Sequence, residues 1–254
     1  MVAQEKLDKV LFGLVGKNIS YSFSKAYFSD KFIDFELSNH EYLNFDIENI
    51  EDFYKIILEF KTSLKGLNIT IPYKQSIFKY LDSIDYIAKE IGAVNTVKFT
   101  KKGNLVGYNS DVVGFEKSIK PLLKPHHIKA LILGTGGASK AVSYVFNSLG
   151  INYLNVSRDP SKKKEISYSE INKELLEEYT IIINTSPLGT YPNTDQKPSI
   201  PYRYLSKKHL LYDLIYNPPE TAFLIEGKKQ GAQIKNGFEM LELQAEESWR
   251  IWNK

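Results

Sequence analysis

The chain has 254 residues and a mass of 29.1 kDa, which is enough for one large domain or two smaller ones. Lys plus Arg number 33 and Asp plus Glu number 30, so a net charge of only +3 does not favour nucleic acid as a main partner. The absence of cysteine excludes disulfides, thiolate nucleophiles and cysteine-ligated zinc. The four histidines do not form the helical zinc motif of two histidines around an acidic residue, so no metal site is expected.

The N-terminal segment lacks the signals of export and of a membrane anchor. Its first apolar run, Val10–Val15, is short and follows Glu5 and Asp8, whereas a signal peptide has a basic start and a longer apolar stretch. No window approaches the ~18 apolar residues that a membrane helix needs. These features favour a soluble, cytoplasmic protein.

From the N-terminal segment to about residue 110, apolar runs of strand length alternate with segments of helical period. Strands are predicted at Val10–Val15, Leu67–Ile71, Ala93–Phe99 and Val106–Tyr108. Helices are predicted over Ser22–Leu37, Glu51–Phe60, Gln75–Leu81 and Ile84–Ile91.

A second alternating series follows. Strands are predicted at Ala130–Leu133, Asn152–Val156, Thr180–Asn184, Leu210–Ile215 and Gln233–Lys235. Helices are predicted over Val113–Lys120, Ala138–Leu149, Thr221–Lys229 and Phe238–Trp252. The stretch from Arg158 to Thr180 is short and predicts a loop or a single turn. This alternation indicates an α/β protein with parallel sheets.

A glycine-rich segment, Gly134-Thr135-Gly136-Gly137-Ala138, follows a predicted buried strand and opens a predicted helix. The glycines let the backbone approach a pyrophosphate, and the N-terminus of the helix supplies backbone amides. Ser139 stands where the usual motif has its third glycine. An ordinary strand-to-helix turn is the alternative, but the flanking elements favour a nucleotide-binding loop.

The residues after the next strand favour NADP over NAD. Proteins that bind NAD usually carry an acidic residue about 20 positions after the glycines, where it binds the ribose hydroxyls. Here the strand ends near Ser157 and Arg158 follows, and a guanidinium matches a 2′-phosphate. Lys162 could add charge, whereas Asp159 could accept from ribose hydroxyls and keeps NAD open as the less favoured alternative.

Small polar residues gather where strands of the first series meet helices or loops, and this edge of an open α/β sheet is where ligands bind. Each has an ordinary alternative: Ser22 could be only a helix cap, Asp111 only an N-cap, and Lys74 only a solvated lysine. Together, ahead of a nucleotide loop, they indicate a substrate site. The segments are Ser20-Tyr21-Ser22-Phe23-Ser24, Gly66-Leu67-Asn68-Ile69-Thr70-Ile71-Pro72-Tyr73-Lys74, Gly92-Ala93-Val94-Asn95-Thr96 and Gly107-Tyr108-Asn109-Ser110-Asp111.

These segments resemble, in order, the motifs of the shikimate dehydrogenase family. That family shows Ser-x-Ser, Asn-Val-Thr-x-Pro-x-Lys, Gly-Ala-Val-Asn-Thr, Asn-Thr-Asp and Gly-x-Gly-Gly-Ala, and then two motifs near the end of the chain. Here those two read Asp213-Leu214-Ile215-Tyr216-Asn217-Pro218 and Gly237-Phe238-Glu239-Met240-Leu241-Glu242-Leu243-Gln244-Ala245. The resemblance covers nearly the whole chain, and seven motifs in one order are far more specific than one glycine loop.

The resemblance implies an NADP-dependent oxidoreductase that reversibly oxidises shikimate to 3-dehydroshikimate in the shikimate pathway of aromatic amino-acid biosynthesis. It implies an α/β fold with an N-terminal open α/β substrate domain, residues 1–111, completed by the C-terminal helix 238–254. A Rossmann-type nucleotide domain, residues 112–237, would follow, with the active site in the groove between them. The expected partner is shikimate, with no nucleic acid and no membrane, and the chain is expected to be a monomer or homodimer.

The resemblance also implies roles for single residues. Ser22 and Ser24 match the pair that binds the substrate carboxylate. Other substrate contacts match Thr70, Asn95, Asp111, Tyr216 and Gln244. The pyrophosphate would be held by Gly134, Thr135, Gly136, Gly137 and Ala138. The adenosine phosphate would face Ser157, Arg158 and Lys162, and the nicotinamide would lie near Leu214 and Gly237.

Lys74 matches the catalytic lysine of the family, and Asp111 is the second residue assigned to catalysis. When hydride leaves the carbon, some group must accept the hydroxyl proton. A free lysine side chain titrates near ~10.4, too high for an efficient base at neutral pH, and a neighbouring carboxylate favours the ammonium form. The sequence leaves open whether Lys74 is a base or stabilises the developing alkoxide.

Two alternatives stay open at this point. A quinate/shikimate dehydrogenase of the same fold would use NAD as readily as NADP, and Asp159 motivates it. A non-catalytic protein that senses NADPH or shikimate would keep the binding residues without turnover, but the presence of both Lys74 and Asp111 argues against it.

Overall fold

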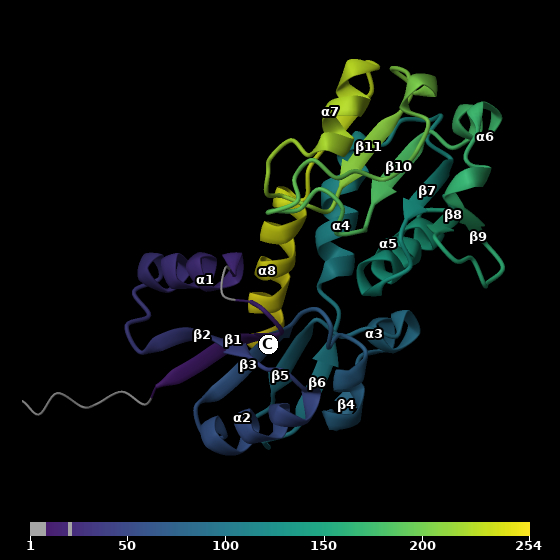
Figure 1. Cartoon of the computed structure of the whole chain (residues 1–254). Helices are drawn as coiled ribbons and strands as arrows, with labels where there is room; N and C mark the ends of the chain where they lie inside the picture. Colours follow the sequence, from purple (N-terminus) through teal and green to yellow (C-terminus); the bar gives the residue numbers. More distant parts are fainter. Residues whose placement is uncertain (1–8, 20–21) are drawn as a thin grey trace, which may run out of the picture. The chain divides into compact units, whose positions relative to one another are not determined.

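The computed structural model describes residues 9–19 and 22–254 (Figure 1). The chain divides into two compact units: one contains the residues up to Ser110 together with Ala245–Lys254, and the other is Asp111–Gln244. Residues 1–8, which carry part of the expectation that the chain is not exported, lie outside the described residues. Across residues 9–19 and 22–254, no helix has both the length and the apolar character needed to cross a bilayer.

The described part of the first unit is built on a sheet of six strands in the order β2-β1-β3-β5-β6-β4. The strands are β1 (Val10–Gly16), β2 (His40–Asp46), β3 (Leu64–Ile69), β4 (Ser83–Ile84), β5 (Thr96–Phe99) and β6 (Leu105–Tyr108). β1 is parallel to both β2 and β3, whereas β5 is antiparallel to both β3 and β6. β4 is parallel to β6, so the sheet is mixed instead of purely parallel, and both antiparallel pairs involve β5. A tight turn through Gly103, with φ +83°, joins β5 directly to β6 as a hairpin.

Helices cover both faces of this sheet (Figure 1). They are α1 (Phe23–Asp34), α2 (Phe53–Phe60), α3 (Tyr86–Ile91) and the end of α8 (Phe238–Trp252), with 3₁₀ helices at Ile50–Asp52 and Ser76–Tyr80. The segment predicted as a helix over Gln75–Leu81 is thus a 3₁₀ helix. Phe28 of α1 stacks on Tyr42 with ring centres 4.8 Å apart, and Trp252 of α8 donates from Nε1 to the Val97 carbonyl at 3.1 Å. The last residues of the chain are therefore part of the core of the first unit.

The described second unit is built on a six-stranded sheet in the order β12-β11-β10-β7-β8-β9, and every neighbouring pair in it is parallel. The strands are β7 (Lys129–Leu133), β8 (Asn152–Ser157), β9 (Glu165–Ser167), β10 (Ile181–Asn184), β11 (Leu210–Asp213) and β12 (Gln233–Lys235). The helices are α4 (Asp111–Ile119), α5 (Gly137–Ser148), α6 (Lys173–Glu178), α7 (Ala222–Lys229) and the start of α8, with 3₁₀ helices at Lys120–Leu122, Tyr168–Glu170 and Tyr202–Tyr204. This sheet has the parallel form that the sequence predicts.

The stretch from Arg158 to Thr180 is more structured than predicted. It forms β9, a 3₁₀ helix and α6, so the prediction of a loop or a single turn is wrong. Asn172 begins α6 by accepting from the Leu175 amide at 2.9 Å, and Leu176 is fully buried. A cap and a buried leucine stabilise a helix too short to show a clear period in the sequence.

Candidate active site

The carboxyl ends of β1 and β3 meet at one edge of the first sheet, because the two strands are parallel. Thr70 follows β3, and its amide donates to the Val15 carbonyl at 2.9 Å. Asn95 directly precedes β5, which is antiparallel to β3, so it lies at the same edge; its carbonyl accepts from the Ile69 amide at 2.8 Å. The structure thus places Thr70 and Asn95 at the same edge of the sheet.

Lys74 is held at this edge by its backbone. The turn from Thr70 closes through a hydrogen bond from the Tyr73 amide to the Thr70 carbonyl at 2.9 Å, and the buried Tyr73 side chain donates to the Ile47 carbonyl at 2.7 Å. The Lys74 carbonyl then accepts from the Val94 amide at 2.8 Å. Lys74, itself half-buried, is therefore fixed beside the segment that carries Asn95.

The two serines of the predicted carboxylate pair lie at the start of α1. Ser22 occupies the N-cap position, but its side chain makes no capping hydrogen bond, and its buried Oγ has no partner among residues 9–19 and 22–254. An unpaired buried hydroxyl is uncommon and costs free energy, so a ligand that pairs with it is the natural explanation. Ser24 is also buried, and its side chain is hydrogen-bonded to Tyr42.

The glycine loop of the second unit has the geometry that a pyrophosphate requires. Gly134 has φ +128°, and a Cβ there would lie 2.6 Å from the Thr185 hydroxyl, so this position needs glycine. Gly136 is the N-cap of α5, no side chain caps that helix within the described residues, and a Cβ on Gly136 would have nothing within 4 Å. Ser139 donates to the Gly136 carbonyl at 2.7 Å, which turns its hydroxyl inward and explains why serine fits at the third position of the motif. The loop therefore fits a dinucleotide.

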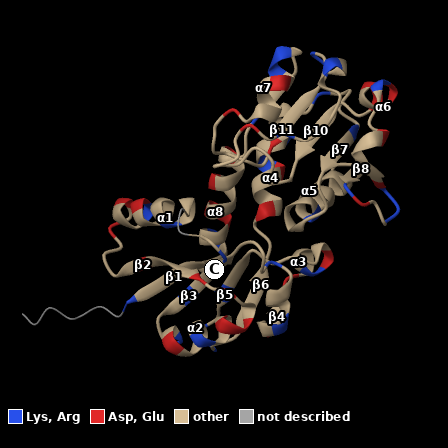
Figure 2. Ribbon diagram, viewed as in Figure 1, with Lys and Arg blue, Asp and Glu red and all other residues tan. Residues whose placement is uncertain are grey.

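The loop after β8 carries the residues predicted to face an adenosine phosphate (Figure 2). Ser157 accepts from the Asp159 amide at 3.2 Å, and Arg158 between them is exposed. Glu165 holds the far end of the loop by accepting from the Lys162 amide at 3.1 Å, and the Lys162 ammonium lies 4.0 Å from the same carboxylate. Part of the Lys162 charge is therefore balanced within the protein, and Arg158 is the better placed of the two for a phosphate.

A buried carboxylate, that of Asp213, organises the end of β11; it opens a family motif but was assigned no role from the sequence. Asp213 accepts from the Thr221 hydroxyl at 2.6 Å, and from the Asn184 side-chain amide and the Ile215 amide at 3.0 Å each. Burial is the main cause that raises the pKa of Asp213 from 3.8 to about 6. These bonds tie the end of β10 to the end of β11 and to the start of α7. The motif that begins at Asp213 was the sequence signal for this role.

Leu214 and Gly237, predicted near the nicotinamide, lie together. The Leu214 amide donates to the Asn184 carbonyl at 3.0 Å, and the Leu214 carbonyl packs so closely on Gly237 that a Cβ has no room there. Tyr216 follows two residues later and is half-buried, and burial raises the pKa of its hydroxyl.

Asp111 and Gln244 lie on two helices of the second unit that pack closely. Asp111 is the first residue of α4 and is 7% exposed. Gly114 lies three residues later on α4, and a Cβ there would be 2.7 Å from the Met240 carbonyl oxygen and 3.1 Å from the Gln244 backbone nitrogen. The two helices therefore approach each other closely at Gly114. The Gln244 side chain donates back to the Leu241 carbonyl at 3.0 Å. Because α4 begins at Asp111, this residue is part of the helix and is not the N-cap before it.

Comparison with known proteins agrees with this arrangement. The family model of the shikimate dehydrogenase substrate binding domain matches residues 14–97. A relative from Methanococcus vannielii named shikimate dehydrogenase (NADP(+)) is 40% identical over 261 residues, which cover 96% of this chain and 91% of the relative. The chain belongs to the shikimate dehydrogenase family.

Solved shikimate dehydrogenases share the fold over nearly the whole chain. One, crystallised in complex with NADP⁺, has a TM-score of 0.84 at 32% identity and covers 96% of this chain and 90% of its own. Another, from Aquifex aeolicus, has a TM-score of 0.84 at 34% identity and covers 96% and 92%. The family and the α/β fold predicted from the motifs are therefore confirmed, and the chain is an oxidoreductase of the shikimate dehydrogenase family.

Proposed function

We propose that the chain catalyses the reversible, NADP-dependent oxidation of shikimate to 3-dehydroshikimate. The observation that supports this most is the 40% identity, over 96% of the chain, to a shikimate dehydrogenase (NADP(+)). The proposal assigns the substrate to residues 1–111 with the helix 238–254, and NADP to residues 112–237. We further propose that the protein is cytoplasmic and that it is a monomer or a homodimer. Its partner would be shikimate and not nucleic acid.

The substrate carboxylate would bind at the start of α1. The buried Ser22 Oγ, which has no partner among the described residues, would donate to one carboxylate oxygen, and Ser24 would contribute the second hydroxyl. Both stand at a helix N-terminus, where the partial positive charge of the backbone favours an anion.

The ring hydroxyls would be recognised by side chains of fixed geometry. We assign these contacts to Thr70, Asn95, Asp111, Tyr216 and Gln244. Thr70 and Asn95 lie at one sheet edge, and Asp111 and Gln244 lie on packed helices. A site that pairs each hydroxyl rejects analogues lacking one, because its own buried polar groups would be left unpaired.

Lys74 and Asp111 would handle the proton of the reacting hydroxyl. Either the Lys74 amine would take the hydroxyl proton as the hydride leaves the carbon, or the proton would pass to solvent water while the Lys74 ammonium donates a hydrogen bond to the developing alkoxide. Asp111, as a carboxylate, would accept a hydrogen bond from a substrate hydroxyl and orient it. Either role requires both side chains for turnover.

The glycine loop and the loop after β8 would hold NADP, which when bound supplies the nicotinamide that accepts the hydride. The pyrophosphate would lie on the backbone of Gly134–Ala138, where Gly136 leaves open space. Ser157, Arg158 and Lys162 would contact the 2′-phosphate. Leu214 and Gly237 would form the surface under the nicotinamide.

The test is a set of initial rates that crosses shikimate and quinate with NADP and NAD. Shikimate with NADP is expected to give the highest kcat/KM by a wide margin. Equal rates with NAD, or turnover of quinate, would replace the proposal with the quinate/shikimate alternative that Asp159 motivated. Binding of both ligands without turnover of any pair would support the sensor alternative.

A further inference from the structure

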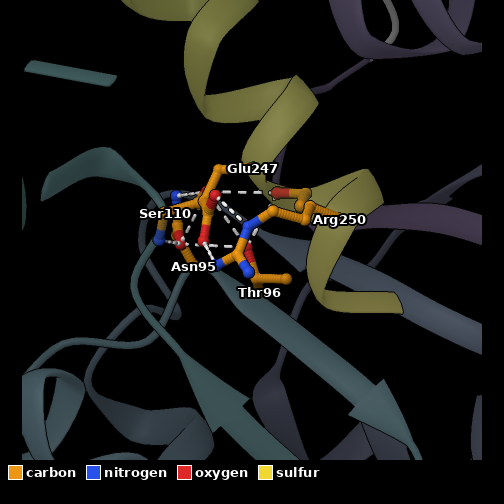
Figure 3. A network of polar contacts seen from close by, with 6 residues as sticks. Asn95, Thr96, Ser110, Glu247 and Arg250 are labelled. Carbon is orange, nitrogen blue, oxygen red and sulfur yellow. Dashed lines mark hydrogen bonds and ion pairs between the residues drawn. The ribbon is translucent and has the colours of Figure 1, made fainter. Parts of the chain in front are cut away.

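Three buried hydroxyl groups, from Thr96, Ser110 and Ser248, meet next to Asn95; we call them the hydroxyl cluster. The Oγ atoms of Thr96 and Ser248 are 2.9 Å apart, and each lies 3.1 Å from Ser110 Oγ. All three residues are fully buried. Figure 3 shows Asn95, Thr96 and Ser110 pointing toward one another, beneath the helix that carries Glu247.

The hydroxyl cluster fixes the orientation of the Asn95 amide. Asn95 Oδ1 accepts from the Ser110 backbone amide at 2.7 Å and from Thr96 Oγ1 at 3.1 Å, and Asn95 Nδ2 donates to Ser110 Oγ at 3.0 Å. A side-chain amide has an accepting end and a donating end of nearly equal shape, so only its hydrogen-bond partners decide which way it faces. Here the Asn95 oxygen faces the Ser110 backbone amide and the Thr96 hydroxyl, both of which donate to it. The Asn95 amide nitrogen is therefore held on the opposite side of the side-chain amide.

The same hydrogen bonds continue from the hydroxyl cluster toward α1. Asn68 Nδ2 donates to Ser248 Oγ at 2.9 Å, so the Ser248 proton is left for the cluster. Tyr42 donates its one hydroxyl proton to Asn68 Oδ1 at 2.8 Å and is also bonded to Ser24. Ser24 must therefore be the donor to Tyr42. An unbroken chain of hydrogen bonds thus links Ser24 to Asn95, two residues assigned to opposite parts of the substrate.

We propose that the hydroxyl cluster is a positioning device for substrate binding, with Thr96 and Ser248 as positioning residues that act through Asn95. This inference rests on the proposed function, since it assumes that Asn95 contacts shikimate. Ser248 lies on α8, four residues after Gln244, so the helix that supplies one assigned substrate contact also fixes another.

The experiment compares Thr96→Val with Thr96→Ser. Valine keeps the branched shape that suits β5 but removes the hydroxyl, whereas serine keeps the hydroxyl. Thr96→Val is expected to raise KM for shikimate about five- to tenfold, the size of one buried hydrogen bond, with KM for NADP unchanged. Thr96→Ser is expected to behave like the wild type.

Two further variants separate positioning from general stability. Ser248→Ala removes a second hydroxyl of the cluster and is expected to raise KM for shikimate in the same way. Ser118→Ala is the matched control, because Ser118 is equally buried on α4 and its Oγ lies 2.7 Å from the Tyr212 hydroxyl, outside the cluster. It is expected to lower thermal stability and leave both KM values unchanged.

A double-mutant cycle tests the route through Asn95. If Thr96 acts by orienting Asn95, Thr96→Val adds no further rise in KM to the Asn95→Ala variant. The inference is overturned if the wild type turns over shikimate while Thr96→Val and Ser248→Ala keep its KM, or if the effects of the two cycle substitutions multiply. A wild type that neither binds nor turns over shikimate overturns the proposed function, and the inference with it.

Discussion

The strand ends of the two units carry groups of different kinds. In the first unit, buried side-chain amides and hydroxyls fill the edge of the sheet, among them Asn68, Asn95 and Ser110. In the second unit, the edge after β7 carries glycine and the N-terminus of a helix, and Gly136 has open space in place of a Cβ. A ring with several hydroxyls needs partners at fixed positions, whereas a pyrophosphate needs backbone amides and room.

This difference has a consequence for mutation. Most polar groups at the edge of the first sheet bond to each other, so removing one disturbs both binding and stability. The proposed pyrophosphate site in the glycine loop is made of backbone, so an added methyl group at Gly136 is expected to block cofactor binding and leave the fold intact.

The largest effect is expected for Lys74→Ala, which tests whether the first unit also carries the proton chemistry. Its kcat with shikimate is expected to fall about 10²–10⁴-fold, the usual contribution of a positioned proton donor or acceptor, while the Kd of shikimate changes little. Lys79→Ala is the control, because the Lys79 ammonium pairs with Glu51 at 2.9 Å on the surface. Wild-type kcat in Lys74→Ala would remove the lysine from the mechanism.

The next largest effect is expected for Gly136→Ala, which sharpens the contrast between backbone and side-chain recognition. The Kd of NADP is expected to rise at least about tenfold, because a methyl group would stand where the pyrophosphate binds. The free energy of unfolding should fall by no more than the ~1 kcal/mol that alanine costs at an N-cap. The Kd of shikimate should not change. Unaltered NADP binding, measured by calorimetry, would show that the loop does not hold the cofactor.

Arg158→Gln tests the choice between NADP and NAD. Loss of a charged hydrogen bond to the 2′-phosphate is expected to raise KM for NADP about tenfold and to leave KM for NAD unchanged. Arg203→Gln, which removes an exposed guanidinium stacked on Tyr204, controls for net charge. If Arg158→Gln weakens both cofactors equally, Arg158 does not read the phosphate.

Among these variants, Asp213→Asn is expected to change activity least. It tests the titration of a buried carboxyl group that lies in the second unit. Burial raises the pKa of Asp213 from 3.8 to about 6, so the folded chain binds more protons between these two values than the unfolded chain does. The contribution of Asp213 to stability is therefore greatest below about pH 4 and is lost as the pH rises through about 6.

Because asparagine does not titrate, the free energy of unfolding of Asp213→Asn relative to the wild type is expected to rise between pH 4 and pH 7, by up to about 3 kcal/mol. Urea unfolding of both proteins at several pH values measures the difference. A difference that does not vary with pH would contradict the assignment of a raised pKa to this carboxyl group.

Much of the fold could be predicted from local signals. The helix predicted over Phe238–Trp252 has those bounds in the structure, because its apolar residues repeat with helical period over fifteen positions. β2 and β9 were not anticipated, since His40–Asp46 is largely polar and Glu165–Ser167 has only three residues. Such strands form because β1 and β8 offer unpaired edges, which is a property of the fold and not of their own sequence.

The site divides in the same way. Motif residues such as Thr70 and Asn95 could be expected at strand ends, because the apolar run and the turn residues that mark a strand end lie next to them in the sequence. Ser248 could not be expected beside Asn68, since 180 positions separate them in the chain. The roles assigned to single residues stay predictions until they are measured.

The most direct measurement compares Ser22→Ala with Gly136→Ala in the same binding assays for shikimate and NADP. Ser22 Oγ has no hydrogen-bond partner among the described residues, so its removal breaks no bond found there, and a Cβ on Gly136 meets no atom within 4 Å. We expect Ser22→Ala to weaken the binding of shikimate but not of NADP, and Gly136→Ala to weaken the binding of NADP but not of shikimate. Equal weakening of both ligands by either variant would contradict the assignment of the substrate carboxylate to Ser22 and of the pyrophosphate to the glycine loop.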